Sequence, residues 1–463
     1  MRRQAYRLNR RRFLRSLGGG AAAVAAAAGC AAGRRAQAAQ DDRPNVVLIF
    51  TDDQGYHDLG CFGAETFDTP HVDRMAERGM KFTDFYVAAP VCSASRAALL
   101  TGCYPIRTGI TGVLFPRNKN GLTREKKTVA EILKTRGYAT ACIGKWHLGT
   151  GTETVTGLPD HAEFMPTHRG FDYYYGIPYS NDMKPTPVIR NLETVEEPAE
   201  QATLTQRYTE EAVRFIREHK DGPFFLYVPH TMPHIPLAAS EGFRGKSARG
   251  LYGDVIEEID WSTGQILKTL RDLGLEENTL VIYTSDNGPW LSKGKHGGCA
   301  DPLRDGKFTT WEGGFRMPCV MQWPGRIPAG TVCREMALSM DLTPTFAALA
   351  GADLPDGYEM DGASLLPLME GRSGAETPHE AFFYYRGNRL EAVRSGTWKL
   401  ILYQGAEKGE PGRPLELYDL AADIAETTSV AKDHPDVVER LTGLAVAGVK
   451  RVGGRLGKGV KKK

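Results

Sequence analysis

Polar side chains that could carry out chemistry follow four apolar runs of strand length in this sequence. The first run ends in two aspartates and the second in a lysine and a histidine. The third leads to a histidine and the fourth to an aspartate and an asparagine. These residues are Asp52, Asp53, Lys145, His147, His234, Asp286 and Asn287. Each segment alone is typical of an ordinary turn. An open parallel sheet, however, binds ligands beyond the carboxyl ends of its strands. Four such segments therefore predict one shared site.

Four of these residues offer only oxygen donors to a metal ion. Asp52, Asp53, Asp286 and Asn287 suit Ca²⁺, or alternatively Mg²⁺, better than zinc, whose catalytic ligands normally include histidine or cysteine. No Cys-x-x-Cys pair is present to build a structural zinc site. The sequence therefore predicts a single site for a hard divalent cation.

The same end of the predicted sheet gathers basic and titratable groups. Arg96, Lys145 and Lys307 are cationic, and His147 and His234 titrate near neutral pH. With neutral histidines, the three aspartates, one divalent cation and these three basic residues sum to a net positive charge. Such a site attracts a tetrahedral oxyanion.

The most specific segment is residues 92–102, CSASRAALLTG. It resembles the signature of the type I sulfatases, which reads Cys-x-Pro/Ala-x-Arg followed by Thr-Gly. Cys92, Ala94, Arg96, Thr101 and Gly102 fill this pattern, with Ala94 in the place of the commoner proline. In that family a formylglycine-generating enzyme converts the cysteine into formylglycine, and the resemblance implies the same for Cys92. If residues 93–100 are helical, Cys92 lies at the helix N-terminus, where an anion is favoured, and Arg96 lies one turn along on the same side.

Further blocks of the family occur in the same order along nearly the whole mature chain. They are residues 52–55 (DDQG), 144–149 (GKWHLG), 233–236 (PHIP), 285–288 (SDNG) and 303–314 (LRDGKFTTWEGG). Residues 176–179 (GIPY) and 297–299 (GGC) are particularly similar to the arylsulfatase A-like members. Phe308 departs from the pattern, because many members have glycine beside the residue that corresponds to Lys307. We expect this phenylalanine to reshape the substrate pocket.

The resemblance implies an alkaline-phosphatase-like fold and the hydrolysis of sulfate esters. Thiols and simple alcohols attack sulfur poorly without activation. In the family, a hydrated aldehyde supplies two hydroxyls on one carbon: one, polarised by the metal, attacks the sulfur, and the other later expels sulfate. The implied metal ligands are Asp52, Asp53, Asp286, Asn287 and the modified side chain of Cys92.

The resemblance also implies a role for each basic and titratable residue. Arg96 holds the hydrate, while Lys145 and Lys307 clamp the sulfate. His234 protonates the departing alcohol, and His147 deprotonates the second hydroxyl.

Four other residues near these motifs are interpreted as structural. His57 and His71 are expected in turns or on the surface, and Trp146 is expected to pack in the core. His230 is expected to support His234 rather than to act as a catalytic group.

Periodic patterns predict the scaffold that must position the site. Strands are expected at residues 45–50, 138–143, 224–228 and 279–283, and helices at 72–78, 129–136, 208–219 and 252–273. This alternation predicts an α/β fold with a mostly parallel sheet flanked by helices. Later strands at 382–385, 391–394 and 398–403 and a helix at 435–450 predict a small C-terminal antiparallel sheet and helix. We divide the chain into a catalytic domain, residues 41–373, and a C-terminal subdomain, residues 374–463.

Residues 1–40 have the order of a signal peptide, with a basic segment, a soft apolar segment and small residues. The paired arginines in NRRRFLR, residues 9–15, resemble a twin-arginine signal. Two processing sites compete: Cys30 could carry a lipid anchor, and AQA at residues 36–38 fits a cleavage site. We expect export by the twin-arginine machinery, so that the protein is periplasmic or secreted, or lipid-anchored through Cys30.

Composition excludes some classes of function and leaves others open. Lys plus Arg number 58 against 56 Asp plus Glu, and basic clusters occur only at the termini, so nucleic acid is not an expected partner. The expected substrate is a sulfated saccharide, with aryl sulfates as surrogates. Two alternatives remain: a phosphonate or phosphodiester hydrolase with the same modified cysteine, and a sulfated-glycan-binding protein in which Cys92 is never converted.

Overall fold

The computed structural model describes residues 43–149, 162–354, 357–402 and 415–456. The predicted signal peptide, with Cys30 and the alternative cleavage site, lies outside the described residues. Within those four ranges, no helix is both long and apolar enough to cross a lipid bilayer.

Four parallel strands form the centre of the larger sheet, which has 11 strands among the described residues. In spatial order they are β8 (Thr279–Ser285), β1 (Asn45–Thr51), β7 (Phe224–Pro229) and β3 (Ala139–Ile143). Strand β1 pairs in parallel with β7 and β8, and β3 pairs in parallel with β7. The four strands predicted from apolar runs are confirmed, as is the mostly parallel α/β sheet, and their carboxyl ends meet at one edge.

The outer strands make the sheet mixed. Strand β9 (Arg316–Gln322) runs antiparallel to both β8 and β2 (Met80–Tyr86), and β4 (Tyr173–Gly176) pairs in parallel with β3. The sheet is completed by β5 (Val188–Arg190), β6 (Glu193–Glu196), β10 (Thr331–Cys333) and β11 (Ala337–Leu338). An antiparallel strand needs no crossover helix, so strand–helix alternation in the sequence does not reveal β9.

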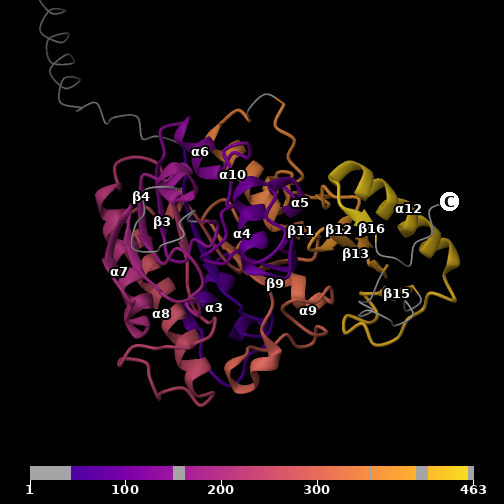
Figure 1. The fold of residues 1–463 in the computed structure, drawn as a ribbon, viewed down its shortest axis with the longest axis horizontal. Helices are drawn as coiled ribbons and strands as arrows, with labels where there is room; N and C mark the ends of the chain where they lie inside the picture. Colours follow the sequence, from indigo (N-terminus) through magenta and orange to yellow (C-terminus); the bar gives the residue numbers. More distant parts are fainter. Residues whose placement is uncertain (1–42, 150–161, 355–356, 403–414, 457–463) are drawn as a thin grey trace, which may run out of the picture. The chain divides into compact units, whose positions relative to one another are not determined.

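Helices cover both faces of the larger sheet (Figure 1). Because successive side chains of a strand point to opposite faces, β1 contributes Leu48 and Phe50 to one core and Val47 and Ile49 to the other. The first core contains α4 (Cys92–Thr101), α6 (Val129–Lys134) and α10 (Leu342–Ala350), and the second contains α3 (Pro70–Glu77), α7 (Leu204–Glu218) and α8 (Leu251–Asp272). Shorter helices are α5 (Pro105–Thr108), α9 (Glu312–Phe315) and α11 (Leu366–Met369).

The smaller sheet is built by the C-terminal part of the chain. Its antiparallel strands are β12 (Phe382–Arg386), β13 (Arg389–Ser395), β14 (Trp398–Ile401) and β15 (Glu416–Asp419), and α12 (Pro435–Val452) packs against β13 and β14. The short β16 (Arg455–Leu456) adds one parallel pairing to β13. The predicted antiparallel sheet and helix are confirmed; residue 403, the expected end of the third strand, lies outside the described ranges. The division between residues 373 and 374 stays a prediction.

A buried ionic cluster lies between the two sheets. Nζ of Lys399 on β14 is 2.9 Å from Oε1 of Glu312 on α9 and 2.8 Å from Oε1 of Glu426, and all three residues are fully buried. Burial opposes ionisation of both carboxylates. Lys399 and nearby arginines nevertheless lower the pKa of Glu312 to about 2, whereas burial and the charge of Glu312 raise the pKa of Glu426 to about 7. The ammonium group of Lys399 therefore pairs with two carboxylates, and the ionisation of one disfavours the ionisation of the other.

Candidate active site

The loops that follow β1, β3, β7 and β8 converge at the carboxyl edge of the sheet, where they bring the predicted site residues together. Two further predicted residues, Cys92 and Arg96, come from α4, and Lys307 comes from the segment before α9. Every predicted site residue is at most 6% exposed. Polar groups buried to this degree must pair with one another or with a ligand.

Cys92 is the first residue of α4. Val91 before it is extended, with φ −151° and ψ 146°, so the free N–H groups of the first helical turn surround the position of the cysteine. Burial raises the pKa of the Cys92 thiol, and the charges of Lys145 and Lys307 oppose this shift. A buried neutral thiol is a poor nucleophile, although the helix N-terminus favours an anion at this place.

Arg96 links three of the converging loops. Its Nε and Nη2 donate to Oδ2 of Asp286 at 3.0 and 2.8 Å, and its Nη1 donates to the backbone carbonyl of Lys145 at 2.9 Å. Nη2 also lies 3.3 Å from Oδ2 of Asp52. Because these side chains are completely buried, loss of the guanidinium group would leave uncompensated charge.

Two buried lysines pair with the two aspartates that follow β1. Lys145 forms an ion pair with Asp52, and its Nζ donates to Oγ of Ser180 at 3.2 Å. Nζ of Lys307 lies 2.7 Å from Oδ1 and 2.8 Å from Oδ2 of Asp53. Burial disfavours the charge on Lys307, but the attraction of Asp53 outweighs it and raises the pKa of this ammonium group. Lys307 is therefore held as a cation.

His234 is oriented through its Nδ1. This nitrogen lies 2.6 Å from the carbonyl oxygen of Ile235 and 3.1 Å from Oδ1 of Asn181. Because both oxygens can only accept, Nδ1 carries a proton in either charge state of the ring. Nε2 is then the nitrogen available to a ligand, and it lies 3.6 Å from Oδ2 of Asp53.

His147 presents the opposite nitrogen. Its Nε2 donates to the backbone carbonyl of Leu114 at 2.8 Å, and its Nδ1 is buried with no hydrogen-bond partner among the described residues. Burial, reinforced by the charge of Lys145, lowers the pKa of His147 well below its ordinary value. The ring is therefore neutral, and Nδ1 is a free acceptor.

The predicted cation donors fit a hard divalent ion. Oδ1 of Asp52 and Oδ1 of Asn287 are buried, and neither has a hydrogen-bond partner in the described part of the chain. Asn287 Nδ2 donates to Oδ1 of Asp53 at 2.7 Å, and Asp286 Oδ1 accepts the backbone N–H of Asp53 at 3.2 Å, so the four donors lie together. Ligand atoms of Asp52, Asp53 and His234 also lie within 4.8 Å of one another. His234 was not predicted from the sequence to be a metal ligand.

The residues that surround His234 were not predicted from the sequence. Ser180 and Asn181 follow β4, whose short run YYYG lacks the aliphatic pattern that marked the other strands. Trp290 was also missed; its ring centroid lies 5.7 Å from that of His234. The sequence did contain a signal for these residues, because each of them follows a segment that matches the family pattern within a few positions.

In the described part of the chain, the residues interpreted as structural form no side-chain hydrogen bond with a predicted site residue. Trp146 is buried, and its Nε1 donates to the carbonyl of Phe164 at 2.8 Å, which confirms its packing role. His71 is exposed and His57 is half-buried. His230 is fully buried against the ring of Tyr208, and burial lowers its pKa to about 4. Neither of its ring nitrogens has a hydrogen-bond partner in the described ranges, and its support of His234 stays a prediction.

A mostly parallel sheet whose carboxyl edge holds oxygen donors, two lysines and a helix N-terminus defines a hydrolase for esters of tetrahedral oxyanions. The Sulfatase family matches residues 44–352, and the C-terminal region of N-sulphoglucosamine sulphohydrolase matches residues 304–443. The chain therefore belongs to the sulfatase family and is a sulfuric ester hydrolase.

Individual relatives agree with this assignment. Arylsulfatase A of Homo sapiens is 40% identical over 451 residues, which cover 87% of this chain and 87% of that protein. N-acetylgalactosamine-6-sulfatase of Rattus norvegicus is 42% identical over 397 residues, or 80% of this chain and 73% of the relative. A solved structure from work on the metabolism of multiple glycosaminoglycans by Bacteroides thetaiotaomicron is 30% identical, with a TM-score of 0.81, and covers 89% of this chain and 100% of that chain. The alkaline-phosphatase-like fold is confirmed.

Proposed function

We propose that this sulfatase hydrolyses sulfate esters of saccharides, with Cys92 in its formylglycine form and one divalent cation, Ca²⁺ or alternatively Mg²⁺. The observation that carries the proposal is the arrangement of two buried lysine–aspartate pairs, Lys145 with Asp52 and Lys307 with Asp53, around Cys92. A pocket that holds both ammonium groups and cation ligands provides complementary charge for sulfate.

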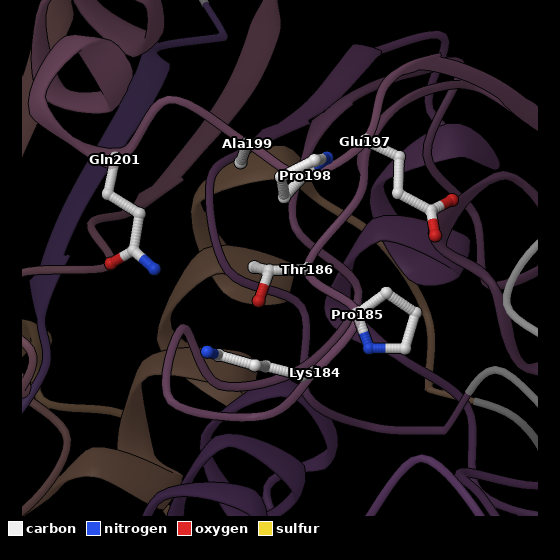
Figure 2. A pocket seen from close by; sticks show the side chains of 7 residues that line it. All are labelled: Lys184, Pro185, Thr186, Glu197, Pro198, Ala199 and Gln201. Carbon is white, nitrogen blue, oxygen red and sulfur yellow. The ribbon is translucent and has the colours of Figure 1, made fainter.

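Two observations support a saccharide as the alcohol part of the substrate. One relative is named for N-acetylgalactosamine, and the similar solved structure comes from work on glycosaminoglycan metabolism. A hollow of about 770 Å³ is linked to the site through one of its lining residues, Gln201. Figure 2 shows the lining residues, which are Lys184, Pro185, Thr186, Glu197, Pro198, Ala199 and Gln201. Asn181, which contacts His234, donates to Oε1 of Gln201 at 3.1 Å. In this proposal the hollow accommodates saccharide rings beyond the sulfated one.

In this proposal, each residue of the site has a separate role in the reaction. Lys145 and Lys307 bind sulfate oxygens, and Arg96 holds the side chain at position 92. His234 keeps its Nδ1 proton and donates a second proton from Nε2 to the departing alcohol oxygen. Burial lowers the pKa of His234, as do the charges of Lys307 and Lys145, whereas Asp53, 3.6 Å away, favours the second proton. His147 accepts a proton at its free Nδ1.

The two cofactors complete the proposed site. Formylglycine, as its hydrate, supplies an oxygen nucleophile in place of a buried neutral thiol. The divalent cation, held by Asp52, Asp53, Asp286, Asn287 and the group at position 92, supplies Lewis-acid stabilisation of negative charge.

The proposal also includes the maturation and the export of the protein. The formylglycine-generating enzyme would modify Cys92, and the twin-arginine machinery would export the protein to the periplasm or beyond, with Cys30 as the alternative lipid anchor. The pattern of residues 92–102 and the paired arginines of residues 9–15 support these steps.

Rates on matched aryl substrates test the proposed function. Protein from its native host should cleave an aryl sulfate much faster than an aryl phosphodiester, and its tryptic peptide of residues 82–96 should contain an aldehyde instead of the Cys92 thiol. Cys92→Ala should remove turnover and keep the fold. Preference for the phosphodiester would indicate the rival hydrolase, and a thiol with saccharide binding but no turnover would indicate a binding protein.

A further inference from the structure

Phe308 adopts a backbone conformation that is unfavourable for its side chain. Its φ is +72°, in the left-handed region, where a bulky residue is strained. The ring is nevertheless 39% exposed, so burial of apolar surface compensates only part of the cost. The conformation is held by the backbone: Phe308 N–H donates to the carbonyl of Pro90 at 3.0 Å, and Lys307 N–H donates to that of Pro289 at 3.0 Å. A strained and exposed aromatic ring next to a reaction site points to a function in binding.

The ring of Phe308 continues a line of rings that begins at His234. The centroids of Phe308 and Trp290 are 5.4 Å apart at an interplanar angle of 78°, and those of Trp290 and His234 are 5.7 Å apart. Nζ of Lys307 lies 4.7 Å from the centroid of Trp290. We call Trp290 and Phe308 together the aromatic wall. It begins beside both groups that would contact the bond to be broken.

The aromatic wall also borders solvent. Lys307 and His234 are nearly completely buried, whereas Trp290 is half-buried and Phe308 exposed. The alcohol part of a sulfate ester must extend from the buried pocket toward solvent, because the sulfate occupies the inner end. The wall lies on this side of the pocket, where a pyranose ring would emerge.

An exposed cation lies against Trp290, the more buried ring of the wall. Nζ of Lys293 lies 4.2 Å from the centroid of Trp290, and the side chain is exposed. Its segment, residues 291–296 (LSKGKH), contains three basic or titratable side chains and no carboxylate. This composition favours an anionic group near the ring-binding surface.

We propose that the aromatic wall of Trp290 and Phe308 binds the sugar ring that carries the sulfate, and that Lys293 binds a second anionic group, a carboxylate or another sulfate, on the same saccharide. The inference rests on the proposed function, since it names the substrate class of that site. The C–H faces of a pyranose are apolar and pack against aromatic rings, while its hydroxyls remain free for water. The substrate is then a polyanionic saccharide rather than a neutral sugar with a single sulfate.

Kinetics of Phe308→Gly and Trp290→Ala test the wall, with a monosaccharide sulfate as substrate and inorganic sulfate as inhibitor. We expect kcat/KM to fall about tenfold, the effect of losing one aromatic contact, while the inhibition constant of sulfate stays unchanged. Phe308→Gly should unfold at the same or a higher temperature, because glycine relieves the left-handed strain. Phe243→Ala is the control, since its ring pairs with Trp261 at 5.8 Å outside the site. Unchanged kcat/KM would show that the rings do not bind the sugar, and equally weakened sulfate inhibition would show that they only support Lys307. Either result would overturn the proposal.

The second anionic group is tested with Lys293→Ala against Lys295→Ala, an exposed neighbour in the same segment. Only Lys293→Ala should lower kcat/KM, and only for a saccharide that bears a carboxylate besides its sulfate ester. The loss should shrink at high salt. Equal losses in both variants, or none, would reject this part.

Failure of the wall can be distinguished from failure of the proposed function. If wild-type protein cleaves the aryl sulfate but the wall variants behave like wild type on the saccharide, only the wall is wrong. If wild-type protein cleaves neither ester, calorimetric binding of the saccharide sulfate to Cys92→Ala still tests the wall. Trp290→Ala in that background should then weaken binding about tenfold, and unweakened binding would overturn the inference.

Discussion

Lys307 and Asp53 form an almost completely buried ion pair, with Nζ 2.7 Å from one carboxylate oxygen and 2.8 Å from the other. Asp53 is a proposed ligand of the cation, and Lys307 is a proposed ligand of the sulfate. The pair therefore joins the proposed cation site to the proposed sulfate site. In the absence of both ligands, the charges of Lys307 and Asp53 neutralise each other. Loss of either partner would leave a buried charge without a counter-ion, which costs about 3–5 kcal/mol.

Lys307→Ala is expected to lower kcat on an aryl sulfate at least about 100-fold. Its free energy of unfolding without added cation should fall by about 3–5 kcal/mol, because Asp53 loses its partner. Ca²⁺ should restore more stability in this variant than in wild type, since a cation can compensate the same carboxylate. Thermal unfolding with and without Ca²⁺ measures this difference, and Lys268→Ala, which removes an exposed pair with Asp272, is the control. Equal Ca²⁺ shifts in Lys307→Ala and wild type would contradict the shared role of Asp53.

Removal of divalent cations should abolish turnover. Because the predicted ligands are oxygen donors, Ca²⁺ or Mg²⁺ should restore activity better than zinc. Asp53→Ala and Asn287→Ala should weaken Ca²⁺ binding measured by calorimetry, because each removes an oxygen that has no equally placed substitute. An unchanged rate in rigorously metal-free protein would rule out the cation.

His234→Ala should separate substrates by their leaving group. A phenolate departs readily without a proton, whereas a sugar alkoxide is far more basic and needs one in the transition state. Loss of the acid should therefore slow single-turnover cleavage of a sugar sulfate by about 10²–10⁴-fold, and that of nitrophenyl sulfate much less. Equal losses on both substrates would reassign His234 to sulfate or cation binding and leave Lys307 as the better acid candidate.

The ionic cluster between the sheets predicts a pH dependence of stability. Folding raises the pKa of Glu426 from 4.5 to about 7, so between these values the folded chain binds the extra proton. The free energy of unfolding should therefore fall, by up to about 3 kcal/mol, as the pH rises from about 5 to about 7.5. Glu312 acts in the other direction: the stability from its lowered pKa is present above 4.5 and is lost as the pH falls toward about 2.

Glu426→Gln tests this dependence, because glutamine resembles the protonated carboxyl at every pH. Urea unfolding between about pH 5 and about pH 7.5 should show a smaller fall for Glu426→Gln than for wild type. Glu210→Gln, at an exposed position of α7, should retain the wild-type slope. Parallel pH profiles for Glu426→Gln and wild type would mean that Glu426 is already ionised at pH 5.

The central scaffold was predictable because its signals are local. The four central strands are continuous apolar runs, as expected for strands buried on both faces, and each is followed by short polar segments. Placement of those segments at one edge follows from parallel pairing alone. Asp52, Lys145, His234 and Asp286 could therefore be grouped from the sequence alone.

The remainder depends on contacts that no local pattern encodes. Ser180 and Asn181 reach the site because β4 pairs with β3, and Trp290 gains its place from contacts with His234 and Phe308. The pairing of Lys307 with Asp53 joins residues separated by 254 positions. Phe308 could be flagged by comparison with the family pattern, but its strained backbone and the rings beside it are properties of the folded chain.

The burial of Cys92 has a consequence for biosynthesis. The thiol is 2% exposed within α4, so a separate enzyme that must grip the residues around it could not reach them in the folded protein. Conversion of this cysteine would have to occur while the newly made chain is still unfolded. It would therefore compete with the packing of α4 against the sheet. Overproduction that saturates the modifying enzyme should then yield correctly folded molecules that remain permanently inactive. The fraction of active protein would then depend on the rate of cysteine conversion relative to the rate of folding, and not on the stability of the fold.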